Sequence, residues 1–315
     1  MPRATLLLPA RAAFAGPVLP PAVAVALGRG DRSEHAPGRR AQLQRHFEWL
    51  PRTWPVAALT RESDAGDAGS GQWLRADPAW IRPDINGARL FASGEGLRLG
   101  AADVDALLPA LRPLFGDAGM PIDGPHPSRW YLHIAPGAVL PAFPEPDDAL
   151  GVDLGDAVVD AADDANARRW RALLSEAQVV LHNHPWNARR AREGKPPVNS
   201  LWFWGGGALP DRIATRFASV ASNDVLVRGL AARAGLEAGA RPEAFVMPPA
   251  SDALLDAGAE ADPGSLSTQW LLPALQAVRR GSLETLTLDF ADGARFDLRA
   301  GQRWRLWRRP LRSLA

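Results

Sequence analysis

The densest group of chemically versatile side chains lies between residues 181 and 207, in the sequence LHNHPWNARRAREGKPPVNSLWFWGGG. This segment contains two histidines, three asparagines, three arginines, three tryptophans, a glycine triplet and Lys195, the only lysine of the chain. Imidazole groups can hold a metal or carry a proton, and guanidinium and ammonium groups bind carboxylates and phosphates. Three chemistries therefore have to be compared: a metal site, a covalent catalyst and an anion-binding site.

A metal site in this segment would use His182 and His184 as its first ligands. The residues before them have a helical pattern, and side chains two positions apart on a helix point about 200° away from each other. A zinc-type site also needs a third protein ligand, and none follows at a recognisable spacing. A covalent catalyst is not expected either, because Ser200 lies within an apolar strand pattern and the sequence has no nucleophile elbow or phosphate-binding glycine loop.

An anion-binding site fits the segment best. Its arginines and lysine supply charged donors, its asparagines can orient neutral groups, and the backbone of residues 205–207 can approach a ligand closely. We predict that the ligand-binding residues are His182, His184, Asn187, Arg189, Arg190, Lys195 and Asn199. The alternative is that the arginines face solvent, the asparagines cap turns, and the three tryptophans belong to the core.

The pattern around this segment predicts an α/β fold with a mixed, mostly parallel sheet covered by helices. Apolar residues at helical spacing run from Ala167 to Leu181, a short helix begins near Pro185 and ends at Gly194, and Val198 to Trp204 is apolar on both faces, which is typical of an interior strand. A C-terminal β-hairpin is predicted over 283–299, with Asp292-Gly293 at its turn. Further helices are predicted at 39–50, 102–116, 223–236 and 266–281, and strands at 5–8, 88–92, 129–136, 216–222 and 243–248, with a loop at 62–72.

The chain has 315 residues, which suits one large or two ordinary domains. We predict a single α/β unit over residues 1–315, and a division into an irregular N-terminal lobe at 1–100 and a second lobe at 101–315 is the alternative. The formal net charge of +1 provides no general attraction for nucleic acid or an anionic membrane. The chain has no cysteine, so that disulfides and thiolate chemistry are excluded.

The amino terminus resembles a secretory signal only superficially. Its uncharged apolar run covers just Ala4 to Ala10 before Arg11 interrupts it, which is short for a signal peptide. No apolar run in the sequence has membrane-spanning length. We therefore expect a first strand at 5–8 and a cytoplasmic protein without a membrane partner.

Two charged runs stand apart from the predicted site. Eight acidic residues and no basic one occur between Glu145 and Asp164, and we expect a solvated flap there in preference to a carboxylate metal site. Six arginines and no acid occur between residues 299 and 312, where Trp304 and Trp307 alternate with them. A charged edge strand is the favoured interpretation of this second run, and contact with a protein partner, phosphate or bases is the alternative.

At this point the sequence resembles a known family. The segment HPWNARRAREGKPPVNSLWFWGGG is similar to the HP-x-N-x-x-R-x-x-x-G-x-x-x-A-N segment, with its following strand and glycines, of the archaeal-type cofactor-independent phosphoglycerate mutases of the alkaline phosphatase superfamily. The matched positions are His184, Pro185, Asn187, Arg190, Gly194 and Asn199, and 77–92 and 127–134 are weaker matches. The whole chain resembles the RpfE-type bacterial regulatory proteins, which are phosphoglycerate mutase-like.

The departures from the mutase pattern point away from catalysis. The mutases begin with a strand that ends in Asp-Gly, carry a serine or threonine nucleophile, and close with histidine-containing motifs that hold two metals. Here the first strand is followed by PARAAF, and no histidine occurs after His184. We therefore expect a catalytically degenerate regulatory protein that binds a small phosphorylated or carboxylated metabolite and needs no cofactor. An active metal-dependent mutase or phosphatase and a protein-interaction module remain as alternatives; divalent metal is expected only in the active enzyme.

Overall fold

The computed structural model describes residues 1–14, 19–84, 87–150, 165–248, 251–258, 262–311 and 313–314. The chain forms two compact units: unit 1 comprises Met1–Arg52 and Asp211–Ala315, and unit 2 comprises Thr53–Pro210. The sequence predicts a single unit over 1–315, with a division at residue 100 as the alternative, whereas the two units found here meet in the sequence at residues 52–53 and 210–211, so that unit 2 is inserted into the sequence of unit 1. Composition does not reveal this insertion, because the pairing that closes unit 1 joins β3 (Phe47–Leu50) to β9 (Arg212–Thr215), which are distant in sequence.

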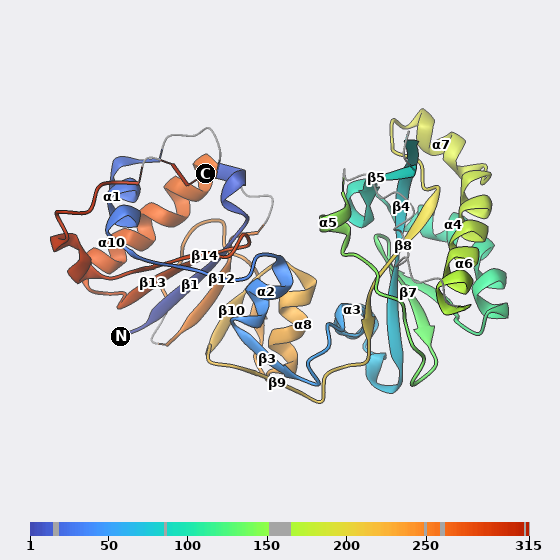
Figure 1. Ribbon diagram of the computed structural model, residues 1–315, viewed down its shortest axis with the longest axis horizontal. Helices are drawn as coiled ribbons and strands as arrows, with labels where there is room; N and C mark the ends of the chain where they lie inside the picture. Colours follow the sequence, from blue (N-terminus) through green and yellow to red (C-terminus); the bar gives the residue numbers. More distant parts are fainter. Residues whose placement is uncertain are drawn as a thin grey trace. The chain divides into compact units, whose positions relative to one another are not determined.

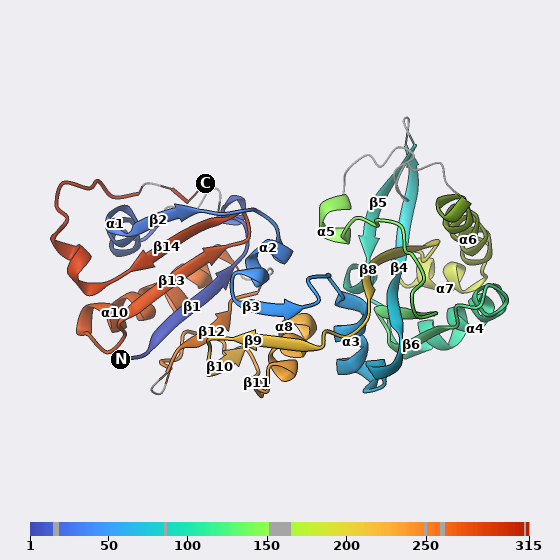
Figure 2. The same cartoon turned by 60° about the horizontal axis from the view of Figure 1, so that its bottom comes forward.

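Unit 1 is built on a seven-stranded sheet with the order β11-β10-β12-β1-β13-β14-β2. Neighbours from β11 to β13 run parallel, and β14 and β2 are antiparallel to their neighbours. The prediction of a mixed, mostly parallel sheet with a C-terminal hairpin is thus confirmed (Figures 1 and 2). The strands are β1 (Arg3–Leu8), β2 (Asp31–Glu34), β10 (Ser219–Ala221), β11 (Ala238–Gly239), β12 (Ala253–Asp256), β13 (Thr285–Phe290) and β14 (Ala294–Leu298).

Helices lie on both sides of this sheet, with α1 and α10 on one side and α2 and α8 on the other (Figure 1). Alternate residues of the central strands, such as Leu6, Leu288 and Phe296, are buried in one apolar cluster with residues of α1 and α10, because successive strand side chains point to opposite faces. The helical segments of unit 1 are η1 (Arg11–Phe14), α1 (Pro21–Arg29), α2 (Arg39–Gln44), α8 (Val225–Arg233), α9 (Pro263–Ser265), the π-helical η4 (Leu266–Leu271), α10 (Leu272–Arg280) and η5 (Ala300–Trp304).

Unit 2 contains an antiparallel sheet in which β4 pairs with β5, β7 and β8, and β7 pairs with β6. The strands are β4 (Gln72–Asp84), β5 (Gly87–Ser93), β6 (Ile122–His126), β7 (Arg129–Ile134) and β8 (Ser200–Gly207). One apolar cluster combines residues of α4, α6 and β8. The helical segments are α3 (Val56–Ala65), η2 (Ala68–Ser70), η3 (Gly94–Leu97), α4 (Ala101–Asp117), α5 (Pro146–Ala149), α6 (Ala165–His182) and α7 (Trp186–Arg192).

Several sequence predictions need correction. The helix expected at 39–50 ends at Gln44 and is followed by β3, because Phe47 and Trp49 alternate with exposed residues at strand spacing. Strand β8, expected as an interior strand, pairs with β4 alone among the described strands, in antiparallel orientation. Parts of the loop expected at 62–72 belong to α3 and η2, no strand forms at 243–248, and residues 300–304 form η5 in place of a last strand.

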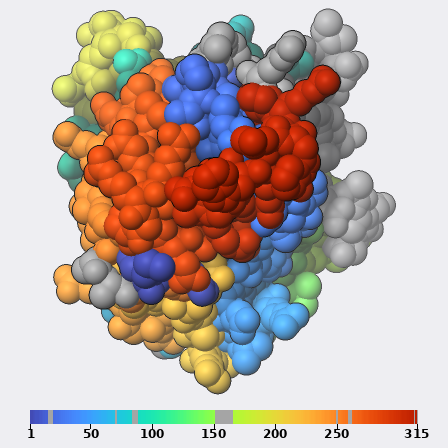
Figure 3. All heavy atoms as spheres, turned by 90° about the vertical axis from the view of Figure 1, so that its left-hand side faces the viewer, coloured from blue at the N-terminus to red at the C-terminus, as the bar shows by residue number. Residues whose placement is uncertain are grey.

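The C-terminal segment lies at the surface of unit 1, where Figure 3 shows it in red beside the orange residues of α10. Within the described residues, no helix combines the length and apolar character needed to cross a lipid bilayer. Most of the acidic run, from residue 151 to 164, lies outside the described residues, so the flap expected there stays a prediction.

Candidate functional site

Arg190 is the most buried of the predicted ligand-binding side chains, and its guanidinium is engaged by the chain itself. It is 1% exposed. Its Nη1 donates to Asp103 Oδ1 at 2.7 Å, its Nη2 to the carbonyl of Leu97 at 2.6 Å, and its Nε to the carbonyl of Pro196 at 2.9 Å. Arg190 therefore joins α7 to α4, to the end of η3 and to the segment before β8, which is an internal role in place of the expected ligand contact.

The two predicted asparagines also bind backbone groups. Asn187 donates to the carbonyls of Leu181 and Val198 and accepts from the Val198 N–H, each at 2.9 Å. Asn199 accepts from the Ile81 N–H at 2.9 Å and donates to the Ile81 carbonyl at 2.7 Å. A side-chain amide that satisfies both groups of one residue acts as an extra strand partner. Both asparagines therefore bond to the backbone of their own unit, as the alternative to a ligand role expected, but they join neighbouring segments and do not cap a turn.

The other predicted residues lie nearer the surface of unit 2. His182 and Arg189 are exposed, and both Arg189 and Lys195 pair with Glu193, at 3.1 and 2.8 Å. His184 accepts a hydrogen bond at Nδ1 from the backbone N–H two residues further on, at 3.2 Å. The structure does not gather these groups around one cavity in the described part of the chain, so that anion binding by them stays a prediction.

The glycine triplet after the tryptophans serves packing. Gly205 has φ +64°, and a Cβ atom there would lie 2.8 Å from the Cβ of Val56. Such a contact is too short for any side chain, so glycine lets α3 approach β8 closely. A Cβ atom at Gly206 would lie 2.4 Å from Leu140 and one at Gly207 would lie 3.1 Å from Pro55, so packing within unit 2 explains the triplet without a ligand.

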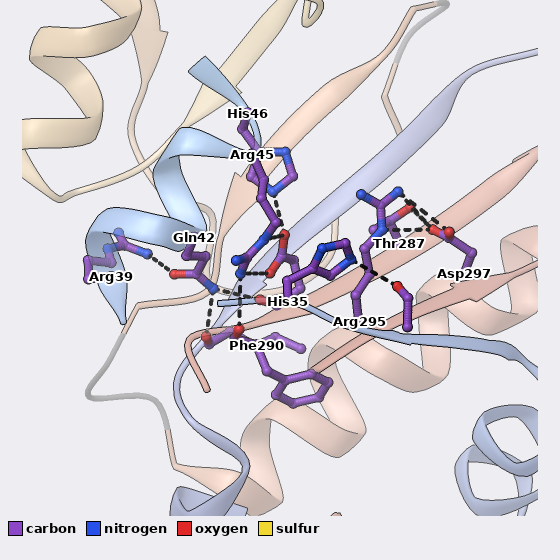
Figure 4. Close-up of polar contacts among 12 residues, drawn as sticks. His35, Arg39, Gln42, Arg45, His46, Thr287, Phe290, Arg295 and Asp297 are labelled. Atoms are coloured by element: carbon purple, nitrogen blue, oxygen red, sulfur yellow. Dashed lines mark hydrogen bonds and ion pairs between the residues drawn. The ribbon is translucent and has the colours of Figure 1, made fainter. Parts of the chain in front are cut away.

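A second polar cluster, which the sequence analysis did not predict, lies at the carboxyl ends of the parallel strands of unit 1 (Figure 4). Asp256 ends β12, and Asp289 is the penultimate residue of β13. Gln42 of α2 donates to the carbonyl of Leu8 at 3.0 Å and to the carbonyl of Asp289 at 2.6 Å. This amide ties the ends of two neighbouring strands at the edge where open α/β sheets bind ligands.

Asp289 is completely buried, and its carboxylate bonds to the side chains of Arg45 and His46. Arg45 donates from Nε at 3.0 Å and from Nη2 at 2.6 Å, and His46 Nε2 lies 2.7 Å from Oδ2. Burial alone raises the pKa of Asp289, but the hydrogen bonds from His46 and Arg45 outweigh it, so the pKa lies below its usual value. Burial lowers the pKa of His46, and a neutral imidazole that donates from Nε2 leaves Nδ1 as an acceptor.

Asp256 is paired in the same manner. Arg39 Nη2 donates to Asp256 Oδ2 at 2.8 Å and to Asp224 Oδ2 at 2.9 Å. The hydroxyl of Ser222 donates to Asp256 at 2.8 Å, and Asp256 Oδ1 accepts the backbone N–H of Gly258 at 3.1 Å. Charge-assisted bonds of this kind are the stronger ones. Both carboxylates at the strand ends are thus neutralised by guanidinium groups of α2 or the residue that follows it.

The pair of divalent ions implied by the mutase resemblance does not fit these residues. In the ranges that the structure describes, no three histidine, aspartate or glutamate side chains are grouped so that they could hold an ion. The acids at the strand ends are bonded to Arg39 and Arg45, and metal ligation would require those bonds to break. Asp153, Asp156, Asp160, Asp163 and Asp164 of the acidic run lie outside the described residues.

A weak sequence signal marks this cluster. Each of Asp256 and Asp289 ends an apolar run, in DALLD and LETLTLDF, and an acid at the end of an apolar strand is a usual position for a ligand residue in parallel sheets. Arg39, Arg45 and His46 carry no comparable signal, because their contacts join α2 to strands more than 200 positions away in the chain.

No family model matches the chain. A probable 2,3-bisphosphoglycerate-independent phosphoglycerate mutase of Geobacter sulfurreducens is 40% identical over 77 residues, which is 22% of this chain and 19% of that protein. The 2,3-bisphosphoglycerate-independent phosphoglycerate mutase of Methanosarcina barkeri is 36% identical over 70 residues, or 21% of this chain and 18% of that protein. The similar segment therefore spans about a fifth of each relative.

Among solved structures, the cofactor-independent phosphoglycerate mutase of Thermoplasma acidophilum aligns with 96% of this chain and 90% of its own, at 15% identity and a TM-score of 0.38. At that score the superposition is too loose to define a shared fold. The sequence comparison is the more specific of the two: one segment of this chain is similar to phosphoglycerate mutases that do not depend on bisphosphoglycerate.

Proposed function

We propose that this protein is a phosphoglycerate mutase-like binding protein that has lost phosphoryl transfer. In this proposal it binds a small phosphorylated or carboxylated metabolite and acts in regulation, in the cytoplasm, as the resemblance to RpfE-type proteins suggests. One observation carries the loss of catalysis: Asp256 and Asp289, the acids at the strand ends of unit 1, are bonded to Arg39 and Arg45. The similar segment supports the kinship with mutases.

Metal-assisted phosphoryl transfer needs ions that lower the pKa of the attacking group and neutralise the charge that develops on the phosphate. A guanidinium neutralises a carboxylate, but it offers no open coordination position for a substrate oxygen. An aspartate already held by bidentate bonds from Arg45 has little capacity left for an ion. These residues favour binding without turnover.

The decisive experiment is a coupled assay for conversion of 3-phosphoglycerate to 2-phosphoglycerate, run with and without manganese. An authentic cofactor-independent mutase is the positive control, and the full chain is expected to give no rate above background under either condition. Turnover that depends on manganese and disappears in Asp289→Asn would refute the proposal and establish the active enzyme.

Ligand binding is tested separately by thermal denaturation with 3-phosphoglycerate, phosphoenolpyruvate, citrate and inorganic phosphate. A ligand that binds only the folded chain raises the melting temperature in proportion to the logarithm of its concentration. We expect such a shift for at least one of these anions and none for a neutral sugar. A melting temperature unaffected by all four would remove the metabolite from the proposal.

A protein-interaction role is favoured by one observation in unit 1. Trp304, Leu306 and Trp307 are 67%, 71% and 77% exposed, and arginines alternate with them. Large exposed apolar side chains in a row are uncommon on a protein without partners. Trp304→Ala and Trp307→Ala, compared with the native chain in pulldown experiments, test this second candidate, and a set of partners unchanged by both substitutions would count against it.

A further inference from the structure

One face of the central sheet of unit 1 is polar. Opposite the apolar face, Thr5 of β1 pairs in register with Thr287 of β13, which in turn pairs with Asp297 of β14. The next row toward the amino ends of the parallel strands holds Arg3 and Thr285. Hydroxyls and charges on a sheet face need polar partners, because burying them against apolar side chains costs free energy. This part of the sheet therefore suits contact with water or a polar ligand.

A cavity of about 240 Å³ lies on this face. Its walls include Thr5, Thr285, Arg216, Arg295 and the ring of Phe217. Pockets for drug-sized ligands have larger volumes, from roughly 300 Å³ upward, so the cavity suits a smaller molecule. It lies at the amino ends of β1 and β13, opposite the end that carries Asp289.

Two threonine hydroxyls in the cavity wall have no hydrogen-bond partner among the residues that the structure describes. Thr5 is 2% exposed and Thr285 is 8% exposed, and neither hydroxyl bonds to any group in the described part of the chain. Neither hydroxyl oxygen is among the polar atoms buried without a partner, so both open into the cavity. Both groups are therefore free to bond to a molecule in the cavity.

The ion pairs of the cavity wall leave one guanidinium, Arg216, and one carboxylate, Asp252, without an ionic partner among the described residues. Arg3 pairs with Glu284 at 2.9 Å, and Arg295 pairs with Asp297 at 3.2 Å, next to Thr287 (Figure 4). Arg216 contacts the ring of Phe217 at 5.0 Å from its centroid, but it has no carboxylate or hydrogen-bond partner among the residues that the structure describes. Its charge is available to a ligand.

The electrostatics of the neighbouring histidine show that the two guanidiniums act on the same region. Burial is the largest cause of the lowered pKa of His46, and the positive charges of Arg216 and Arg295 lower it further. The ring of His46 lies 5.6 Å from the ring of Phe217, which lines the cavity. Arg216, which lies over the ring of Phe217, and Arg295 are therefore both on the side of the cavity nearest His46.

We propose that this cavity binds one small oxyanion, a phosphate monoester or carboxylate, with Arg216 as its charged donor and the hydroxyls of Thr5 and Thr285 as its neutral partners. The site rests on the proposed function, because it gives a location to the anionic metabolite of that proposal. It differs from the predicted surface of unit 2, whose arginine and asparagines bind their own backbone.

The test is isothermal titration calorimetry of the full chain with 3-phosphoglycerate, and with inorganic phosphate as the simplest oxyanion. Arg216→Ala is expected to weaken binding at least about tenfold, since a hydrogen bond to a charged group is lost, and Arg216→Lys is expected to keep part of the affinity. Thr5→Val, which keeps the shape and removes the hydroxyl, is expected to weaken binding several-fold. Arg280→Ala, an exposed arginine at the end of α10, is the matched control and is expected to bind normally.

The outcomes separate this site from the proposed function. Native affinity in both Arg216→Ala and Thr5→Val overturns the cavity and leaves the metabolite proposal standing, whereas no binding by the native chain ends both. Binding of inorganic phosphate as tight as that of 3-phosphoglycerate identifies the phosphate group as the ligand feature recognised. If Arg216→Ala does not fold, as judged by circular dichroism, Arg216→Lys and Thr5→Val decide.

Discussion

Replacing Arg190 by alanine distinguishes a ligand-binding arginine from a structural one. Its guanidinium bonds to Asp103 and to two backbone carbonyls and is 1% exposed. A side chain selected to hold a ligand is often neutral or unfavourable for stability when the ligand is absent. A side chain that satisfies three buried acceptors is required for stability at all times.

The magnitude follows from the partners that lose their donor. Removal of one member of a buried ion pair costs about 3–5 kcal/mol, because the remaining charge stays buried without compensation. Asp103 keeps bonds from the Trp186 indole at 2.7 Å and from the Gly100 N–H at 2.8 Å, which places the expected loss toward the lower end of that range. At about 2–4 °C per kcal/mol for a domain of this size, unit 2 of Arg190→Ala should melt roughly 6–15 °C earlier.

Scanning calorimetry, combined with tryptophan fluorescence, measures this shift. The control is Arg189→Ala, which removes an exposed arginine from the same helix and should change stability by less than about 0.5 kcal/mol. Arg190→Lys should recover little, since an ammonium cannot reproduce the planar fork that reaches three acceptors. If Arg190→Ala melts together with Arg189→Ala, the bonds seen here contribute nothing and Arg190 returns to the set of ligand-binding candidates.

Three further outcomes are expected. Asn199→Asp should destabilise the chain by about 1–3 kcal/mol in urea titrations, because a carboxylate would face a backbone carbonyl; an unchanged midpoint would contradict the amide pairing. Asp289 has a lowered pKa in the folded chain. The stability that its ionised carboxylate contributes is therefore complete above the unfolded pKa of about 3.9 and is lost as the pH falls through the lower folded pKa. The native chain should exceed Asp289→Asn in stability by about 3–5 kcal/mol at pH 7, and this difference should narrow toward pH 3; a difference independent of pH would show that Arg45 and His46 do not hold an ionised carboxylate. An excess of EDTA should leave the melting temperature of the chain unchanged while Arg39→Ala lowers it, and a large effect of EDTA would indicate a bound ion.

The sequence predicts those elements whose pattern is local. β1 was expected from its apolar residues, the β13–β14 hairpin from Asp292-Gly293 at its turn, and α6 from apolar residues at helical spacing. At the turn, Gly293 has φ +93°, and a Cβ atom there would lie 2.1 Å from the carbonyl oxygen of His35. The positive φ is a local requirement that selects glycine and makes the motif readable, whereas the close approach to His35 is a long-range contact.

The elements that were missed depend on distant partners. Residues 47–50 look helical beside α2, but their pairing with residues 212–215 makes them a strand. The same cause limited the site prediction, since Arg190 and Asn199 have residue types suited to a ligand and their real acceptors, at Leu97 and Ile81, lie about 100 positions away. Residue type and spacing thus predict which groups are polar, and only the tertiary structure decides whether a ligand or the chain satisfies them.

Under the proposed function, the guanidinium groups at the strand ends of unit 1 explain how the fold stays stable without bound metal ions. Carboxylates such as Asp256 and Asp289 repel each other and resist burial unless a cation compensates them. Arg39 and Arg45 supply that cation from within the chain and keep their charge at any physiological pH. Under the proposed function, unit 1 therefore needs no bound metal ion for its stability. A binding site elsewhere on the sheet, such as the cavity at Arg216, can then change its ligand without destabilising the strand ends.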